Sequence, residues 1–311
     1  MGITRERNFN STGIEMSLHQ FEPHGPFLRS DLGISANANE NFTTKQVTSV
    51  NLNLNLGTTT RNYFNFHIGG EANPIDEIDY YEARTPGRIF IRTPHYFGSL
   101  FFGTDTRKKL FGSINVFGGS TTLISKTIGY NPFYGTNLQA NMRVTDKLSF
   151  SISGNLFVDD GDRGWVNSDY NGQIIFGLRK LTNVENVISA RYLFRNNLSL
   201  SIRARHYWSK GYYRSFYTLM DDGHLADNIS YDQNHDFNFN AFNIDMVFQW
   251  QFAPGSSMNL VWKNSIYNEG DRAISGYGND LQNTFDAKQL NTVSLKILYY
   301  FDYLYLKKKR K

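Results

Sequence analysis

The chain has 311 residues, enough for one large domain or two ordinary ones. It contains no cysteine, which excludes a disulfide scaffold, thiol chemistry and cysteine-ligated metal. Its net charge of +4 is spread along the sequence apart from a basic tail at 307–311, so the charge does not indicate a nucleic-acid-binding surface.

The chain is rich in aromatic residues but hydrophilic on average. It holds 25 Phe and 19 Tyr, yet its mean hydropathy is −0.46, so apolar residues must be finely mixed with polar ones. No stretch reaches the roughly 18 apolar residues that a membrane-spanning helix needs. The N-terminus "MGITRERNFNSTG" has no apolar signal-peptide core.

Alternation of apolar and polar residues with period two predicts thirteen strands along the chain. Their ranges are 13–20, 27–37, 46–56, 62–70, 88–104, 110–119, 136–144, 148–158, 184–194, 198–210, 239–252, 258–268 and 291–305. Many of these runs last for about ten residues, against a usual strand length of about 5–6. No helical period of useful length and no linker interrupt them, so residues 1–311 are predicted to form a single domain that ends in the 307–311 tail.

The apolar residues fall on even positions on both sides of five turns. Leu52, Leu54 and Leu56 precede one such turn, and Phe64 and Phe66 follow it. Directly opposed residues of a hairpin share a face, so each of these turns must contain an odd number of residues. Residues 145–147 and 195–197 are predicted to be three-residue loops, and the Pro-Gly turn at 254–255 is predicted to belong to a loop of three or five.

The connections at the other end of the hairpins are long and polar. They cover residues 71–88, 158–173, 218–236 and 268–288 and are rich in Asp, Asn, Gly and Tyr. Short turns at one end and long loops at the other are typical of an antiparallel transmembrane β-barrel in an outer membrane, with periplasmic turns and external loops. A tilted strand of about ten residues crosses an apolar band of about 25 Å. We therefore expect the apolar face to meet lipid.

A membrane barrel must close, because an unpaired strand edge leaves backbone groups unsatisfied in lipid. Bacterial single-chain barrels use an even number of strands, so we expect about 14. The fourteenth strand either lies within 172–181 or belongs to a part of a longer protein that precedes this chain. The missing signal peptide favours the second alternative, because an outer-membrane protein must be exported.

Even positions in lipid place odd positions in the lumen. The predicted lumen-facing residues are His67, Arg143, Arg191, Arg203, Arg205, Asp245 and Lys263. These residues either select anionic solutes or simply pair with one another, and mutual pairing is the commoner role in a barrel interior. Aromatic residues near strand ends predict interfacial girdles; they are Phe194, Tyr207, Trp208, Trp250, Phe252, Trp262 and Tyr267.

Motifs for catalysis or metal binding are weak. The stretch "DDGDRG" (159–164) and the triplet "DDG" (221–223) resemble fragments of calcium loops but lack the full spacing, so we expect ordinary external turns. The even number of His206 predicts a ring at the membrane edge, beside Trp208. The histidines form no HxH or HxxxH pair, and no nucleophile elbow is present. We therefore predict no catalytic residues, cofactor or metal.

Two stretches carry a family resemblance: "RHYWSKGYYRSFYTLMDDG" (205–223) and "FNFNAFNIDMVFQWQFAPGSSMNLVWKNSI" (237–266). The chain resembles the C-terminal barrel region of a Gram-negative outer-membrane family of unknown function. In that family, a module that resembles a family 9 carbohydrate-binding module precedes the barrel. The resemblance implies an exported, surface-associated protein that handles glycans. Neither the module nor a signal sequence occurs in these 311 residues, so sugar binding cannot be assigned to any of them.

Three functions are compatible with the sequence. The favoured one is a non-enzymatic outer-membrane β-barrel that acts as a pore or as a membrane scaffold for surface glycan binding or uptake. The alternatives are a membrane-embedded hydrolase, which needs titratable groups that converge at the rim, and a soluble all-β binding domain. The expected partners are outer-membrane lipid and, through the preceding module, glycans; nucleic acid is not expected, and the oligomeric state is left open.

Overall fold

The computed structural model describes residues 8–121, 131–168, 172–270, 276–301 and 303. Within them the chain is almost entirely β-structure. The first eight strands are β1 (Phe9–Gln20), β2 (Phe27–Asn41), β3 (Val47–Thr60), β4 (Asn65–Asn73), β5 (Glu77–Asp79), β6 (Phe90–Arg92), β7 (His95–Gly103) and β8 (Leu110–Thr121). They are followed by β9 (Asn131–Arg143), β10 (Leu148–Ser168), β11 (Ile174–Arg195), β12 (Leu198–Leu219), β13 (Leu225–Asp227), β14 (Phe237–Ala253), β15 (Ser256–Gly270), helix α1 (Tyr277–Phe285) and β16 (Gln289–Leu298). No helix among the described residues is long and apolar enough to cross a membrane.

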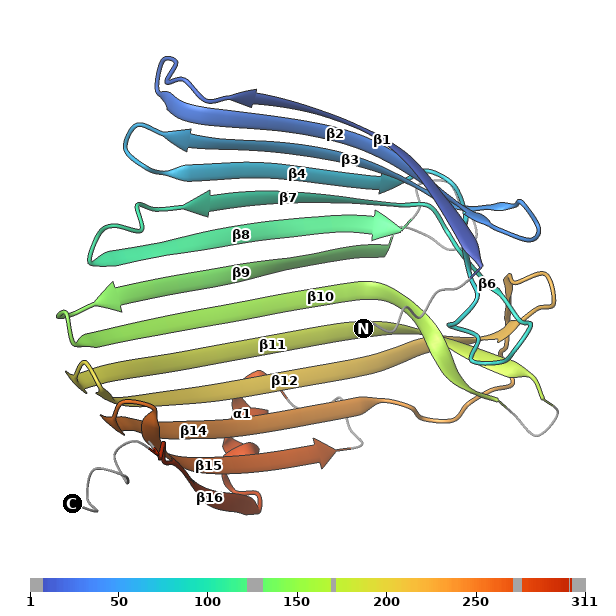
Figure 1. Cartoon of the computed structure of the whole chain (residues 1–311). Helices are drawn as coiled ribbons and strands as arrows, with labels where there is room; N and C mark the ends of the chain where they lie inside the picture. The colour runs from blue at the N-terminus through green and yellow to red at the C-terminus, as the bar shows by residue number, and fades with distance from the viewer. Residues whose placement is uncertain (1–7, 122–130, 169–171, 271–275, 302, 304–311) are drawn as a thin grey trace, which may run out of the picture.

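Fourteen strands form one antiparallel, barrel-like sheet that is not closed. Its order is β1-β2-β3-β4-β7-β8-β9-β10-β11-β12-β14-β15-β16, with the three-residue β13 paired to β12. Figure 1 shows β1 and β16 at opposite edges of the sheet, with short connections at one end of the strands and long ones at the other. Each of the thirteen strands of the continuous order corresponds to one of the thirteen predicted ranges, which confirms the predicted hairpin architecture. Two ranges are too long: residues 90–92 of the range 88–104 form β6 in a separate two-stranded sheet, and β16 ends at Leu298 within the range 291–305.

The two faces of the sheet differ as the alternation predicts. In β14 and β15, Phe248 lies opposite Leu260, and Asp245 lies opposite Lys263, so apolar pairs alternate with polar ones. On the even-numbered face, which we call the apolar face, large side chains are exposed from Ile14 on β1 (75%) to Ile152 on β10 (55%). In β16 the parity changes, because Leu295 lies opposite Leu260, and odd positions continue the apolar face there. We call the opposite face the polar face.

A second sheet does not cover the apolar face in the described part of the chain. The other sheet consists only of β5 and β6, three residues each. Trp250 and Leu260 on the apolar face are 41% and 37% exposed. A β-sandwich would bury these residues between two layers, and the described residues form no second layer over them.

The short turns preserve the parity in two ways. Residues 145–147 form the predicted three-residue loop, closed by the Val144 backbone N–H donating to the Leu148 carbonyl at 2.9 Å. The other two predictions are wrong in detail: Arg195 pairs with Leu198, and Ala253 pairs with Ser256, so each loop has two residues. A register shift beside each of these loops supplies the extra residue. Gly255, at φ +70°, provides the backbone conformation that such tight turns favour.

The small hydrophobic core lies at the long-loop end of the sheet. It contains Ala83, Phe90, Ile174, Phe176 and Leu219, and the Phe90 and Phe176 rings lie 4.7 Å apart. The predicted loop at 158–173 is largely wrong, because β10 continues to Ser168 before β11 begins at Ile174. Residues 174–181 are likewise not a separate fourteenth strand but the start of β11. These extensions hold the segment that connects β4 to β7.

Candidate functional site

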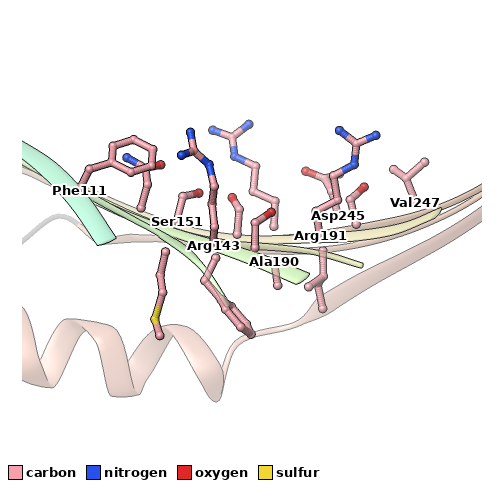
Figure 2. Close-up of a pocket in the computed structure, with 15 residues that line it drawn as sticks. Phe111, Arg143, Ser151, Ala190, Arg191, Asp245 and Val247 are labelled. Carbon is pink, nitrogen blue, oxygen red and sulfur yellow. The ribbon is translucent and has the colours of Figure 1, made fainter. Parts of the chain in front are cut away.

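The polar face contains a hollow of about 610 Å³ that is lined by six neighbouring strands from β8 to β14. In Figure 2, the labelled Arg143, Arg191 and Asp245 side chains rise from one side of the sheet, and a helix lies on the other side. Arg203 also lines this hollow, so the structure brings together four of the seven predicted lumen-facing residues. They come from β9, β11, β12 and β14, whose registers align these positions across the sheet.

Some of the predicted lumen-facing charges form ion pairs. Lys263 Nζ lies 3.7 Å from Asp245 Oδ1, and Arg205 Nε donates to Glu185 Oε1 at 2.5 Å. Arg143 instead donates to the backbone carbonyl of Thr106 at 2.9 Å and so holds the β7–β8 turn. These contacts give Arg143, Arg205, Asp245 and Lys263 structural partners.

Arg191 and Arg203 remain as exposed positive charges in the hollow. Both are exposed, and neither forms an ion pair within the described ranges. Arg203 lies opposite Asp245 in the register, but that carboxylate is the one that approaches Lys263. The hollow is therefore a basic region near the short-turn end. His67 lies on β4 opposite Gly57 and Phe101, away from this group.

The predicted aromatic girdle is only partly assembled. Trp250 packs edge-on against Phe252, Phe252 stacks on Tyr299, and Phe194 contacts Tyr192, all near the short-turn end. Tyr207 and Tyr267, by contrast, lie on the polar face, where their hydroxyls donate to Asn183 and Asn243. Trp262 lies mid-strand, and its indole donates to Asn291. Of the predicted girdle, only Phe194, Trp250 and Phe252 thus lie together at the short-turn end of the sheet.

Trp208 and His206 are not at an exposed edge, because α1 covers them on the apolar face. Trp208 is 7% exposed and His206 is 5% exposed. The Nδ1 atom of His206 lies 3.1 Å from the Tyr277 hydroxyl of α1. The sequence placed His206 on the correct face but gave no sign of the covering helix, since residues 277–285 have no clear apolar period.

A second, larger cavity lies at the long-loop end of the polar face and was not predicted from the sequence. Its volume is about 1310 Å³. One wall is the end of the sheet, with His95, Thr121, Phe133 and Asp159 on four successive strands; the other is the β5–β6 segment with β13. Figure 1 shows β6 at the end of the sheet that the extended β10 also reaches. We call this space the loop-end cavity.

Polar contacts hold β5 and β6 together and attach the segment that contains them to the sheet. Arg92 donates to Oδ2 of Asp79 at 2.9 Å through Nε and at 2.7 Å through Nη2. Glu82 Oε1 accepts the backbone N–H of Trp165 on β10 at 3.0 Å, which attaches the segment to the sheet. Burial by itself would raise the pKa of Asp79. The backbone N–H groups of Tyr81 and Glu82, together with Arg92, more than offset burial and lower that pKa.

The motif "DDGDRG" (159–164) lies in β10, not in an external turn. A register shift between Asp159 and Asp162 marks a bulge there. Asp162 accepts a hydrogen bond from Arg179 Nε at 2.5 Å, and Asp160 lies 3.5 Å from Lys180 Nζ. Burial raises the pKa of Asp159, and the nearby Asp162 adds to the shift. No group of three or more acidic or histidine side chains in the described residues is arranged to hold a metal ion.

Four phenylalanines interrupt the polar face just below the loop-end cavity. Phe97, Phe117, Phe133 and Phe157 come from four successive strands, with contacting ring centroids 5.9–6.4 Å apart. Glycines make room for them: a Cβ on Gly135 would lie 2.4 Å from the Phe117 ring, and one on Gly119 would lie 2.5 Å from the Phe133 ring. We call these residues the phenylalanine row.

Comparison of the whole sequence with family profiles gives a match over residues 1–310 to a family described as a domain of unknown function (DUF5916). The chain belongs to this family. No curated protein matches it. Among solved structures it is similar to the crystal structure of the Pseudomonas putida toluene transporter TodX, at 9% identity and a TM-score of 0.25, over 94% of this chain and 88% of that one. A TM-score this low supports no inference about this member of the family.

The phenylalanine row shows what sequence reasoning could have found in this DUF5916 chain. All four phenylalanines have odd numbers, so each breaks the polar pattern of its strand, at two adjacent levels near the long-loop end. That exception was visible in the sequence. The loop-end cavity was not, because its far wall comes from segments without a periodic pattern, and contacts between residues distant in the chain position that wall.

Proposed function

We propose that this chain is a non-enzymatic outer-membrane β-barrel domain that acts as a pore or as a membrane scaffold. The supporting observation is the apolar face, which carries exposed large side chains on strands from β1 to β16 of a single-layer sheet, apart from the part that α1 covers. A monomeric soluble protein rarely exposes a contiguous apolar patch larger than a few hundred Å². In a bilayer the apolar face would contact acyl chains, so its exposure to water would carry no free-energy cost. Membrane barrels have strands of this kind, with apolar side chains on one face and polar ones on the other.

The open edges of the sheet are compatible with this proposal only if they acquire partners. β1 and β16 end the strand order, and each has a paired neighbour on one side only among the described residues. Unpaired backbone groups in hydrocarbon cost several kcal/mol each. The proposal therefore requires that both edges be paired in the membrane, as they would be in a closed barrel.

The polar face supports a pore or scaffold better than a hydrolase. Carboxylates do converge at the loop end, but Asp79 and Asp162 are each paired with an arginine. No nucleophile adjacent to a base accompanies them in the sequence. The glycan-related role implied by the family resemblance is not carried by any described residue and is not part of this proposal.

Reconstitution tests the membrane setting directly. The chain is expected to require detergent for solubility, to float with lipid vesicles in a density gradient, and to migrate faster unheated than boiled in gel electrophoresis. A chain that is monodisperse without detergent and sediments away from vesicles would refute the proposal. Conductance in planar bilayers then distinguishes a pore from a scaffold.

A further inference from the structure

The loop-end cavity is large and has a defined floor and roof. Its volume of about 1310 Å³ exceeds the 300–1,000 Å³ that is usual for small-molecule sites. Phe133 of the phenylalanine row lies at its floor, and Phe90, Ile91 and Leu225 of β6 and β13 line it from the roof. The cavity thus offers apolar surface to a ligand on two sides.

Acidic side chains outnumber arginines in the lining of the cavity. Its lining includes Asp79 and Asp162, but Arg92 and Arg179 neutralise these two carboxylates. Four further carboxylates line it, namely Asp76, Glu77, Asp159 and Asp227, and they face one further arginine, Arg163. This excess of carboxylates favours a cationic occupant.

Arg163 adds one positive charge to the wall of the cavity. Its Nη2 atom is buried and has no hydrogen-bond partner among the residues that the structure describes. A buried guanidinium donor without a partner is costly. Because that Nη2 atom is enclosed by protein, a ligand in the cavity does not reach it, and Arg163 acts on the cavity through its positive charge alone.

We propose that the loop-end cavity binds an organic cation that carries an apolar or aromatic group. The cationic group would lie among Asp76, Glu77 and Asp227, and the apolar group would lie on Phe133. An inorganic metal ion fits less well, because no group of three acidic or histidine side chains among the described residues is arranged to hold one. This inference goes beyond the proposed function, since binding at this cavity requires no conductance.

Three probes of similar shape test the choice of charge: 2-phenylethylamine, 2-phenylethanol and phenylacetate. Each is titrated calorimetrically into the full chain in detergent at neutral pH. The amine is expected to bind at least about ten-fold more tightly than the alcohol, which a single short-range ion pair supplies. Phenylacetate is expected not to bind. The alcohol also measures non-specific uptake of the phenyl group by detergent.

Variants locate the site. The double variant Glu77→Gln/Asp227→Asn is expected to weaken amine binding about ten-fold and to reduce its dependence on salt. Phe133→Leu should weaken the amine and the alcohol by similar factors. Asp232→Asn is the matched control, because Asp232 is an exposed carboxylate of the same loop end that does not line the cavity. Circular dichroism confirms that each variant folds; Asp76→Asn, at an exposed position, replaces the double variant if that one does not.

Equal or tighter binding of phenylethanol or phenylacetate would overturn the proposal, as would amine binding that the carboxylate variants leave unchanged. Failure of the membrane proposal is a separate outcome. A chain that is soluble without detergent could still bind the amine, and a vesicle-bound chain could fail to do so.

Discussion

Trp208 and Asp280 join helix α1 to the sheet: the indole Nε1 of Trp208 donates to Oδ2 of Asp280 at 3.0 Å. The same carboxylate oxygen accepts Asn238 Nδ2 at 2.9 Å. All three residues are buried. They form a polar patch on a face that is apolar elsewhere, and hydrogen bonds to an ionised group are about twice as strong as neutral ones. The docking of α1 therefore depends on Asp280.

Replacing Asp280 should release the helix. Asp280→Ala removes two charge-assisted hydrogen bonds and leaves the Trp208 indole without this acceptor, at a cost of about 2–3 kcal/mol to the docked state. Limited proteolysis should then cut within 276–288 much faster than in the parent chain. Asp286→Ala is the control, because Asp286 is exposed and follows the same helix. Equal cleavage of the two variants would contradict the role given to Asp280.

Substitutions at two adjacent residues on opposite faces of the sheet test whether the apolar face contacts lipid or water. Ile152 is 55% exposed, and Ser151 lies on the polar face and lines the basic hollow. In lipid, Ile152→Lys should cost about 2–4 kcal/mol of unfolding free energy, whereas Ser151→Lys should cost much less. In water both substitutions would be within about 0.5 kcal/mol of neutral. Denaturant unfolding in vesicles measures the difference, and matching values for the two variants would argue against lipid contact.

The strands of this chain were predictable because one face of the sheet is apolar on every strand. A slip of one residue would move every side chain to the opposite face, so the even parity around Leu54 and Phe66 already determines their register. The same parity rule is enough to place Arg191, Arg203 and Asp245 together on one face. Their actual partners depend on side-chain reach across neighbouring strands, and alternation carries no information about that.

The loop end was not predictable because its structure depends on contacts between distant segments. Phe90 packs on Phe176, which lies 86 positions later in the sequence, and the backbone N–H of Trp165 donates to Glu82. The segments that hold Glu82 and Trp165 were predicted as polar loops, and alternation in the ranges that hold Phe90 and Phe176 gave no sign that the two rings meet. Helix α1 escaped prediction for a related reason: its buried side chains are Asp280 and Thr284, so its inward face is polar. Packing overrides local preference in both cases.

Acid should loosen the β5–β6 segment. The pKa of Asp79 is lowered in the folded state, so its stabilising contribution is complete above the unfolded value near 3.9 and is lost as the pH falls through the lower folded value. Protease cleavage within 74–94 should therefore accelerate as the pH is reduced below about 4. Asp79→Asn should raise cleavage at neutral pH and flatten this pH dependence. The Asp76→Asn chain, altered at an exposed neighbour, should keep the parental profile.

The two exposed arginines of the hollow should set the charge preference of a conducting barrel. Arg191 and Arg203 are exposed on the polar face, so they raise the local concentration of anions. In planar bilayers under a salt gradient, the reversal potential of the parent chain should indicate anion preference, and Arg191→Gln/Arg203→Gln should reduce it. Arg195→Gln removes an equally exposed charge from the short β11–β12 turn and should change selectivity much less. If the double variant keeps the parental reversal potential, these side chains do not face the conduction path, and the assignment of the polar face to a lumen is wrong.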